Sequence, residues 1–130
     1  MIATEMSTRM NPKLLTALLS VCTMANAQYG TLLEFDWGAS GRYPYGSLIS
    51  DGTFLYGMTT NSGSTDGGTI FRIMPDGTGF ATMFDFGDGT VNGRFPHGSL
   101  IHDGTFLYGM TLEGGANGMG TLFKILPDGT

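Results

Sequence analysis

Apolar and polar residues alternate in short runs through the middle of the chain, and these runs predict β-strands. The clearest run is TIFRIM at residues 69–74, in which Ile70, Arg72 and Met74 alternate with the residues between them. The strands predicted in this way are 47–50, 54–59, 69–74 and 81–86.

Turn residues separate the predicted strands. Asp51-Gly52 predicts a β-hairpin, because glycine tolerates the positive φ that a tight turn requires. Pro75-Asp76-Gly77 predicts a turn in which proline presets φ. A loop rich in glycine and serine, NSGSTDGG, lies at residues 61–68. The pattern therefore favours an all-β protein.

One phrase of the sequence occurs twice. DGTFLYGMT fills residues 51–59 and returns 52 positions later at residues 103–111. Residues 43–78 align with residues 95–130 without a gap, and 23 of the 36 positions are identical. A partial third copy, FDWG at 35–38, resembles FDFG at 84–87. The chain is therefore predicted to be a tandem repeat, with a full unit at 43–94 and an incomplete unit at 95–130.

Four short antiparallel strands in each unit of about 50 residues are typical of a β-propeller blade. The strand-like segment 31–37 matches the fourth strand of a unit, so residues 28–130 are expected to form a partial array of about two blades. Two stacked hairpins in an open sandwich are the alternative. Because two blades would leave exposed edges, we expect either a truncated copy of a longer parent, with further blades, or self-assembly of several chains.

The first 27 residues have the order of a signal peptide. Arg9 and Lys13 precede an apolar run at 14–24, and small residues follow up to Ala27. The run is too short for a membrane span, which needs about 20 residues. We expect an exported protein, secreted or at the cell surface, cut after Ala27 and without a transmembrane span in the mature chain. An amphipathic helix that is retained is the alternative.

Charge and cysteine content narrow the function. The net charge is −5, and the cations after residue 27 are dispersed, which argues against a nucleic-acid ligand. They are Arg42, Arg72, Arg94 and Lys124. The one cysteine, Cys22, falls within the predicted signal peptide, so the mature chain would be stabilised without disulfides.

The recurring motifs resemble a known family. LYGMT, a following G-T-x-F and PDGT appear in this order in both copies, and FDFGDG and RFPHGSLI lie between them. They are similar to the GloVer (Gloeobacter/Verrucomicrobia) tandem repeat of exported bacterial proteins, from residue 31 to residue 130. Met58 and Met110 stand where that family more often has threonine. The resemblance implies a propeller-like fold in secreted or surface proteins, and it implies no known reaction.

A glycine-rich loop, DFGDGTVNG at residues 85–93, is a candidate metal site. Asp85, Asp88 and Asn92 could supply oxygen ligands to Ca²⁺, which takes six to eight of them. The D-x-D-x-D-G spacing with its closing glutamate is missing, so a solvated turn with Asx hydrogen bonds is the alternative. We expect no other cofactor.

No catalytic constellation stands out. His97 and His102 correspond to Tyr45 and Ser50 in the other copy, whereas a repeated zinc site would repeat its ligands. No G-x-S-x-G motif is present, and no pair of carboxylates is singled out. The sequence thus favours a protein that is not an enzyme, although a fragment of a polysaccharide-active propeller hydrolase or lyase stays the alternative.

Aromatic residues near the predicted loops are candidates for ligand binding. Their rings could stack on the apolar face of a sugar, or they could pack in the core as the repeated strand aromatics are expected to do. The candidates are Trp37, Tyr43, Tyr45, Phe95 and His97. The sequence thus predicts an exported scaffold for binding or interaction, with a carbohydrate or protein ligand.

Overall fold

The computed structural model describes residues 28–87 and 90–130, and the predicted signal peptide lies outside the described residues. Residues 31–130 form one compact unit, and residues 28–30 are not part of it. Nine strands and no helix are present in the described ranges, as the sequence predicts for an all-β chain. Accordingly, no helix among those residues is long and apolar enough to cross a membrane.

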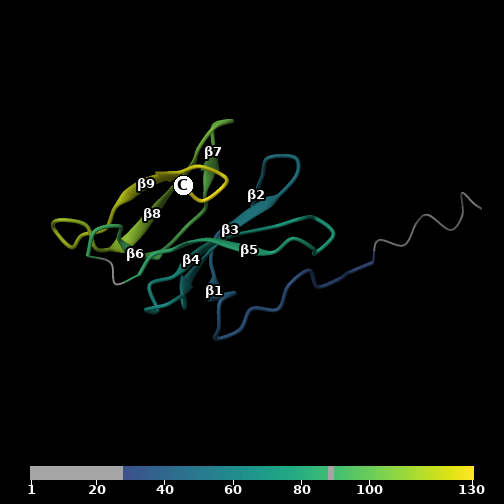
Figure 1. Cartoon of the computed structure of the whole chain (residues 1–130), viewed down its shortest axis with the longest axis horizontal. Helices are drawn as coiled ribbons and strands as arrows, with labels where there is room; N and C mark the ends of the chain where they lie inside the picture. The colour runs from purple at the N-terminus through teal and green to yellow at the C-terminus, as the bar shows by residue number, and fades with distance from the viewer. Residues whose placement is uncertain (1–27, 88–89) are drawn as a thin grey trace, which may run out of the picture. The chain divides into compact units, whose positions relative to one another are not determined.

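The first sheet is built around β3 (Leu55–Asn61). On one side β3 pairs with β4 (Thr69–Ile73), which in turn pairs with β5 (Ala81–Asp85). On its other side β3 pairs with two short strands, β1 (Arg42–Pro44) and β2 (Ile49–Ser50). All these pairings are antiparallel, and the sheet does not close on itself (Figure 1).

The second sheet repeats this arrangement with counterparts of β1, β2, β3 and β4, and within the described residues it has no counterpart of β5. β8 (Leu107–Glu113) pairs with β6 (Arg94–Pro96) and β7 (Ile101–His102) on one side and with β9 (Leu122–Ile125) on the other. Every register pair in this sheet has a counterpart 52 positions earlier in the first sheet. This sheet also stays open.

Two features differ from the sequence prediction. Segment 31–37 is not a strand. The Phe35 ring lies against Phe71 of β4, with 5.3 Å between ring centroids. Because β3 and β5 already pair with both edges of β4, the segment crosses the face of the sheet and has no backbone edge there to join. The sequence also missed β1 and β6, each of which contains a proline.

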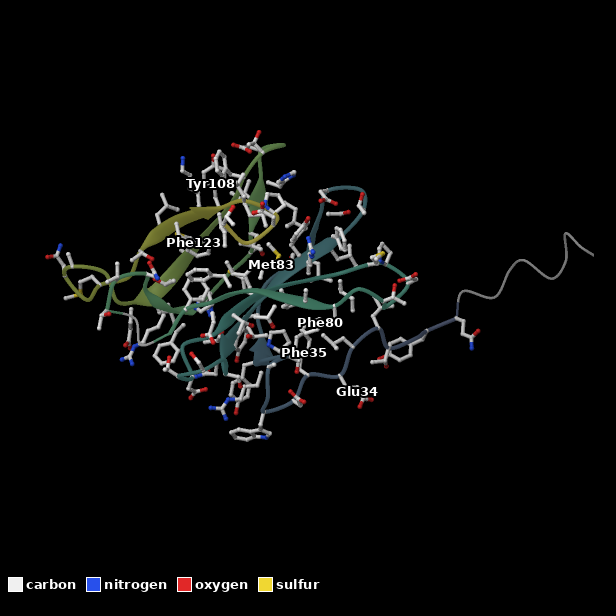
Figure 2. The ribbon with its side chains drawn as sticks, in the orientation of Figure 1. Glu34, Phe35, Phe80, Met83, Tyr108 and Phe123 are labelled. Atoms are coloured by element: carbon white, nitrogen blue, oxygen red, sulfur yellow. The ribbon has the colours of Figure 1, made fainter. Side chains whose placement is uncertain are left out.

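One face of the first sheet packs on one face of the second. Tyr56, Met58 and Ile70 of the first sheet form the core together with Leu107 and Ile125 of the second. We call these the inner faces. Figure 2 shows Met83 of β5 between the sheets and Phe123 of β9 on the side that faces the first sheet. Burial of each such side chain contributes about 1.5–3 kcal/mol.

The predicted Asp51-Gly52 hairpin is confirmed, since Ser50 pairs with Leu55 across it. The Asp51 carboxylate accepts hydrogen bonds from the backbone N–H groups of Thr53 and Phe54, both at 2.8 Å. It also accepts one from the Tyr56 hydroxyl at 2.6 Å. Asp103 makes the same three bonds in the second sheet, so this carboxylate pins the hairpin in both copies.

Each sheet also has a phenylalanine ring above a strand glycine. Gly57 of β3 pairs with Phe71 of β4, and a Cβ added at Gly57 would lie 2.6 Å from Phe71 Cζ. Gly109 and Phe123 repeat this pairing in the second sheet, where the corresponding distance is 2.5 Å. The ring thus occupies the space that a larger residue would need.

Candidate ligand-binding site

An exposed tryptophan marks one loop of the first sheet. Trp37 is the last residue of segment 31–37 and is 80% exposed. Its ring lies against the guanidinium of Arg42, with 4.0 Å from Cζ to the ring centroid. The Tyr43 ring lies 5.4 Å from the same carbon. The arginine therefore lies against both aromatic rings and supports them by cation–π attraction.

Arg42 is itself held in place. It lies on β1, and its Nη2 donates to both carboxylate oxygens of Asp66 in the β3–β4 loop, at 3.0 and 2.9 Å. The Ser62 N–H donates to the same carboxylate at 2.8 Å. This amide, and then the charge of Arg42, lowers the pKa of Asp66 despite some desolvation. Asp66 is consequently ionised at neutral pH and fixes the guanidinium beneath Trp37.

The loop that presents Trp37 is closed by Asp36. The Asp36 carboxylate accepts hydrogen bonds from the Ser40 hydroxyl at 2.6 Å and from the Gly38 N–H at 2.9 Å. The Ser40 bond and then the Gly38 bond lower the pKa of Asp36. These bonds hold the backbone around Trp37, so contact of a ligand with the ring would need little further ordering of the loop.

Trp37 forms one wall of an open hollow of about 320 Å³. Asp85 at the end of β5 also lines it, and its carboxylate accepts hydrogen bonds from the N–H groups of Ser64 and Gly87. Thr82 lines it as well, and its hydroxyl donates to the Ala39 carbonyl at 2.8 Å. An exposed ring beside a carboxylate and hydroxyl groups suits a ligand that has both an apolar face and several hydroxyls.

Two of the predicted ligand residues have unusual backbones. Tyr43 has φ of 54° and its repeat counterpart Phe95 has φ of 57°. Such values are uncommon for residues other than glycine, asparagine and aspartate, and they store strain that the surrounding structure must hold. The Phe95 N–H donates to the Gly67 carbonyl of the first sheet at 2.7 Å. This backbone conformation thus serves the contact between the sheets.

The five predicted ligand residues fall into three groups. Trp37 and Tyr43 lie against Arg42, as described. Tyr45 and His97 form a tilted ring pair, with 5.2 Å between centroids. Phe95 lies over Arg94, at 4.8 Å from its Cζ. The first group alone combines an exposed tryptophan with a hollow.

The structure does not bring the predicted calcium ligands together at one site. Asp85 lines the hollow beside Trp37, whereas Asn92 lines a different cavity of about 350 Å³, where its backbone carbonyl accepts a hydrogen bond from the Thr121 hydroxyl. Asp88 lies outside the described residues. Across residues 28–87 and 90–130, no group of three His, Cys, Asp or Glu side chains could hold a metal ion. The calcium site stays a prediction.

Sequence reasoning missed the polar members of the site. Arg42 and Asp66 are 24 positions apart, and Ser64 and Thr82 sit in segments of ordinary polarity. A signal for Arg42 was available, because arginine precedes an aromatic residue and proline in both copies, as RYP and RFP. In a chain with few cations, a repeated arginine next to a ring indicates a cation–π pair.

Comparison with curated proteins and with solved structures finds no match to the chain. The family model of the Gloeobacter/Verrucomicrobia repeat matches residues 18–130. That range includes both sheets, the hairpins pinned by Asp51 and Asp103, and the Trp37 loop. The chain belongs to the Gloeobacter/Verrucomicrobia repeat family.

Proposed function

We propose that this chain is an exported, non-enzymatic repeat scaffold that binds a carbohydrate in the hollow beside Trp37. The exposure of Trp37 is the observation that carries the proposal. A large ring that packs in no core, yet is held by an arginine and by a closed loop, suits contact with a ligand. The C–H face of a pyranose would stack on the ring, and Asp85, Ser64 and Thr82 would meet its hydroxyls.

Two further parts of the proposal concern architecture and location. We infer that each sheet acts as a propeller-like blade, and the shared registers at an offset of 52 together with the face-to-face stacking support this. The order of charged, apolar and small residues in positions 1–27 supports export. Membership in the repeat family is consistent with both.

Trp37 is the single tryptophan of the chain, so its fluorescence reports on the proposed site. Soluble polysaccharides of different sugar composition are titrated into the purified full chain. A saturable change in emission is expected for at least one neutral or acidic polysaccharide. Isothermal calorimetry with the same polysaccharide then gives the affinity without relying on the tryptophan.

Trp37→Ala should weaken the calorimetric affinity by at least about fivefold, since stacking on an aromatic ring contributes on the order of 1 kcal/mol or more. Trp37→Phe should retain part of the binding. Tyr29→Ala, which removes another exposed ring, is the matched control and should bind like the parent. Unaltered binding by Trp37→Ala, or no response to any polysaccharide, would contradict the proposal.

A further inference from the structure

The outer faces of the two sheets are not equally covered. Met110 and Leu122 on the outer face of the second sheet are 59% and 77% exposed. Their repeat counterparts Met58 and Ile70, on the inner face of the first sheet, are 3% and 0% exposed. The registers Met58↔Ile70 and Met110↔Leu122 place each pair on one face of its sheet. The same kind of apolar face is thus buried in one copy and open in the other.

The chain itself shows what covers such a face. The Met58 and Ile70 face of the first sheet is covered by the face of the second sheet that carries Leu100, Leu107 and Ile125. The counterparts of these three residues are Leu48, Leu55 and Ile73, and they belong to the outer face of the first sheet. Every copy therefore has one face of each kind, and the two kinds fit together.

Segment 31–37 covers only part of the outer face of the first sheet. Phe35 meets Phe71 at 5.3 Å and 66°, as Phe86, which directly follows β5, meets Phe123 at 5.2 Å and 65°. A Cβ added at Gly77 would approach the Leu32 carbonyl, as one at Gly129 would approach the Met83 carbonyl. The segment therefore occupies the position that the end of β5 has between the two sheets.

The remainder of that outer face is hollow. An open cavity of about 340 Å³ is lined by Leu33, Phe35, Leu48, Phe71 and Ile73, among others. In the contact between the two sheets, the corresponding space beside Leu100 is filled by the first sheet, and Leu100 is 4% exposed, whereas Leu48 is 53% exposed. Between the two sheets, the face that carries Met58 and Ile70 fills this space. At the outer face of the first sheet no such face of the described chain packs against the hollow.

We propose that a second copy of this chain docks here, with Tyr108, Met110 and Leu122 of its second sheet set against Leu48 of the first. The contact would reproduce between chains the stacking that joins the two sheets within one chain. It is heterologous, because the two surfaces differ, so a pair of chains keeps one free surface of each kind, one on each chain. Self-association is therefore head-to-tail.

Polar groups at the two surfaces match as well. Within the chain, the Ser47 N–H donates to the Ser99 hydroxyl at 2.9 Å, and the Phe95 N–H donates to the Gly67 carbonyl. Their counterparts across the proposed interface are the Ser99 N–H facing Ser47, and Tyr43 facing the carbonyl of Met119. Tyr43 already has the positive φ of Phe95, so its N–H is oriented for this bond.

The surface of the second sheet stays apolar at a position where its sequence differs from that of the first sheet. Thr60, whose hydroxyl donates to the Pro96 carbonyl, is replaced by Leu112, which is exposed. This costs one hydrogen bond between chains and adds apolar area at the same place. Lys124 replaces Arg72, so a cation is retained.

The test measures the molar mass of the full chain by light scattering over a dilution series. The parent chain should show a mass above that of a monomer that rises with concentration. Leu122→Asp and Leu48→Asp each spoil one of the two surfaces, and both residues are at least half exposed, so each variant should fold and stay monomeric. Tyr29→Asp introduces the same charge at an exposed residue that belongs to neither sheet and should associate like the parent.

Mixing the two variants separates head-to-tail contact from any symmetrical contact. The Leu122→Asp chain keeps an intact first-sheet surface, and the Leu48→Asp chain keeps an intact second-sheet surface. An equimolar mixture should therefore form a dimer of one chain of each kind and nothing larger. Circular dichroism of each variant before mixing verifies that it has the β-sheet spectrum of the parent.

Three results would overturn the proposal. The parent chain could be monomeric at every concentration. The Leu48→Asp variant could associate alone, which would mean that two second-sheet faces pair with each other. The mixture could stay monomeric although both variants are folded, which would mean that these two surfaces do not meet.

Discussion

The two sheets of this protein have the same strands in the same registers, yet the same positions lie in different surroundings. Ile70 and Leu122 occupy the same position of the repeat, yet Ile70 is buried between the sheets and Leu122 faces outward. The position of Leu100 is buried, while that of Leu48 is half exposed. Burial here is decided by the neighbouring sheet and not by the residue, so equal sequence does not mean equal contribution to stability.

The comparison separates two kinds of interaction. Contacts between the sheets exist at one set of positions and are missing at the repeat counterparts. Contacts within a sheet, such as the ring above Gly57 and the pinned Asp51 hairpin, occur in both copies with nearly the same distances. Mutations of the first kind should therefore have unequal effects in the two copies, and mutations of the second kind should have similar ones.

The largest inequality is expected for Ile70→Ala against Leu122→Ala. Ile70 has no exposed surface, and truncation leaves a cavity, so Ile70→Ala should lower the free energy of unfolding by about 2–5 kcal/mol. Leu122→Ala should change it by no more than about 0.5 kcal/mol. Both are measured by urea denaturation in the Leu48→Asp background, where association between chains does not contribute.

Equal losses of unfolding free energy in the two variants would contradict the unequal burial of these two positions. Equal large effects would mean that the outer face of the second sheet is covered in solution even in that background. Equal small effects would mean that the inner faces of the two sheets do not form the core.

Gly57→Ala and Gly109→Ala test the interaction within each sheet. The added methyl group would lie 2.6 Å from Phe71 Cζ in the first sheet and 2.5 Å from Phe123 Cζ in the second, which is too close in both. Overpacking of this kind costs about 1–3 kcal/mol. We expect the two variants to lose similar stability in urea denaturation, and a loss in only one of them would show that the rings are not equivalently placed.

Much of the strand architecture could be predicted from local sequence. The alternation in residues 69–74, the Asp-Gly hairpins and the repeated phrase are all encoded by neighbouring residues. β3 and β4, their counterparts β8 and β9, and β5 follow from them. β1 and β6 were missed because a proline and an aromatic residue with positive φ do not form an alternating pattern. Their pairing with β3 and β8 comes from the tertiary fold.

Segment 31–37 shows the opposite error. Its residues resemble those of β5, so the sequence predicted a strand, but a strand requires a free backbone edge and the segment lies on a sheet face. The Trp37 site was only half predicted for a similar reason. The exposed aromatics could be identified from the sequence, whereas the ion pair of Arg42 with Asp66 depends on a loop being folded back on β1.

The smallest expected effect concerns the pinned hairpins and their dependence on pH. The amide of Phe54 and then the hydroxyl of Tyr56 lower the pKa of Asp51 from 3.8 to about 2. In the second sheet Phe106 and Tyr108 lower that of Asp103 to about 2 in the same way. A lowered pKa means that the ionised carboxylate stabilises the fold above its ordinary pKa, and that this stabilisation is lost as the pH falls from 3.8 through about 2.

Asp51→Asn and Asp103→Asn remove the titrating group, so the melting temperature of each variant should approach that of the parent as the pH falls through this window. Because Asp51 and Asp103 are exposed, water weakens the effect, and a modest shift is expected in both. At neutral pH the difference in melting temperature between variant and parent should be larger for Asp51→Asn. The hydroxyl of buried Tyr56 has less access to water than that of Tyr108. A difference that is independent of pH would mean that the charge of the carboxylate does not hold the hairpin. A larger difference for Asp103→Asn would mean that the first sheet does not shelter its hairpin more than the second.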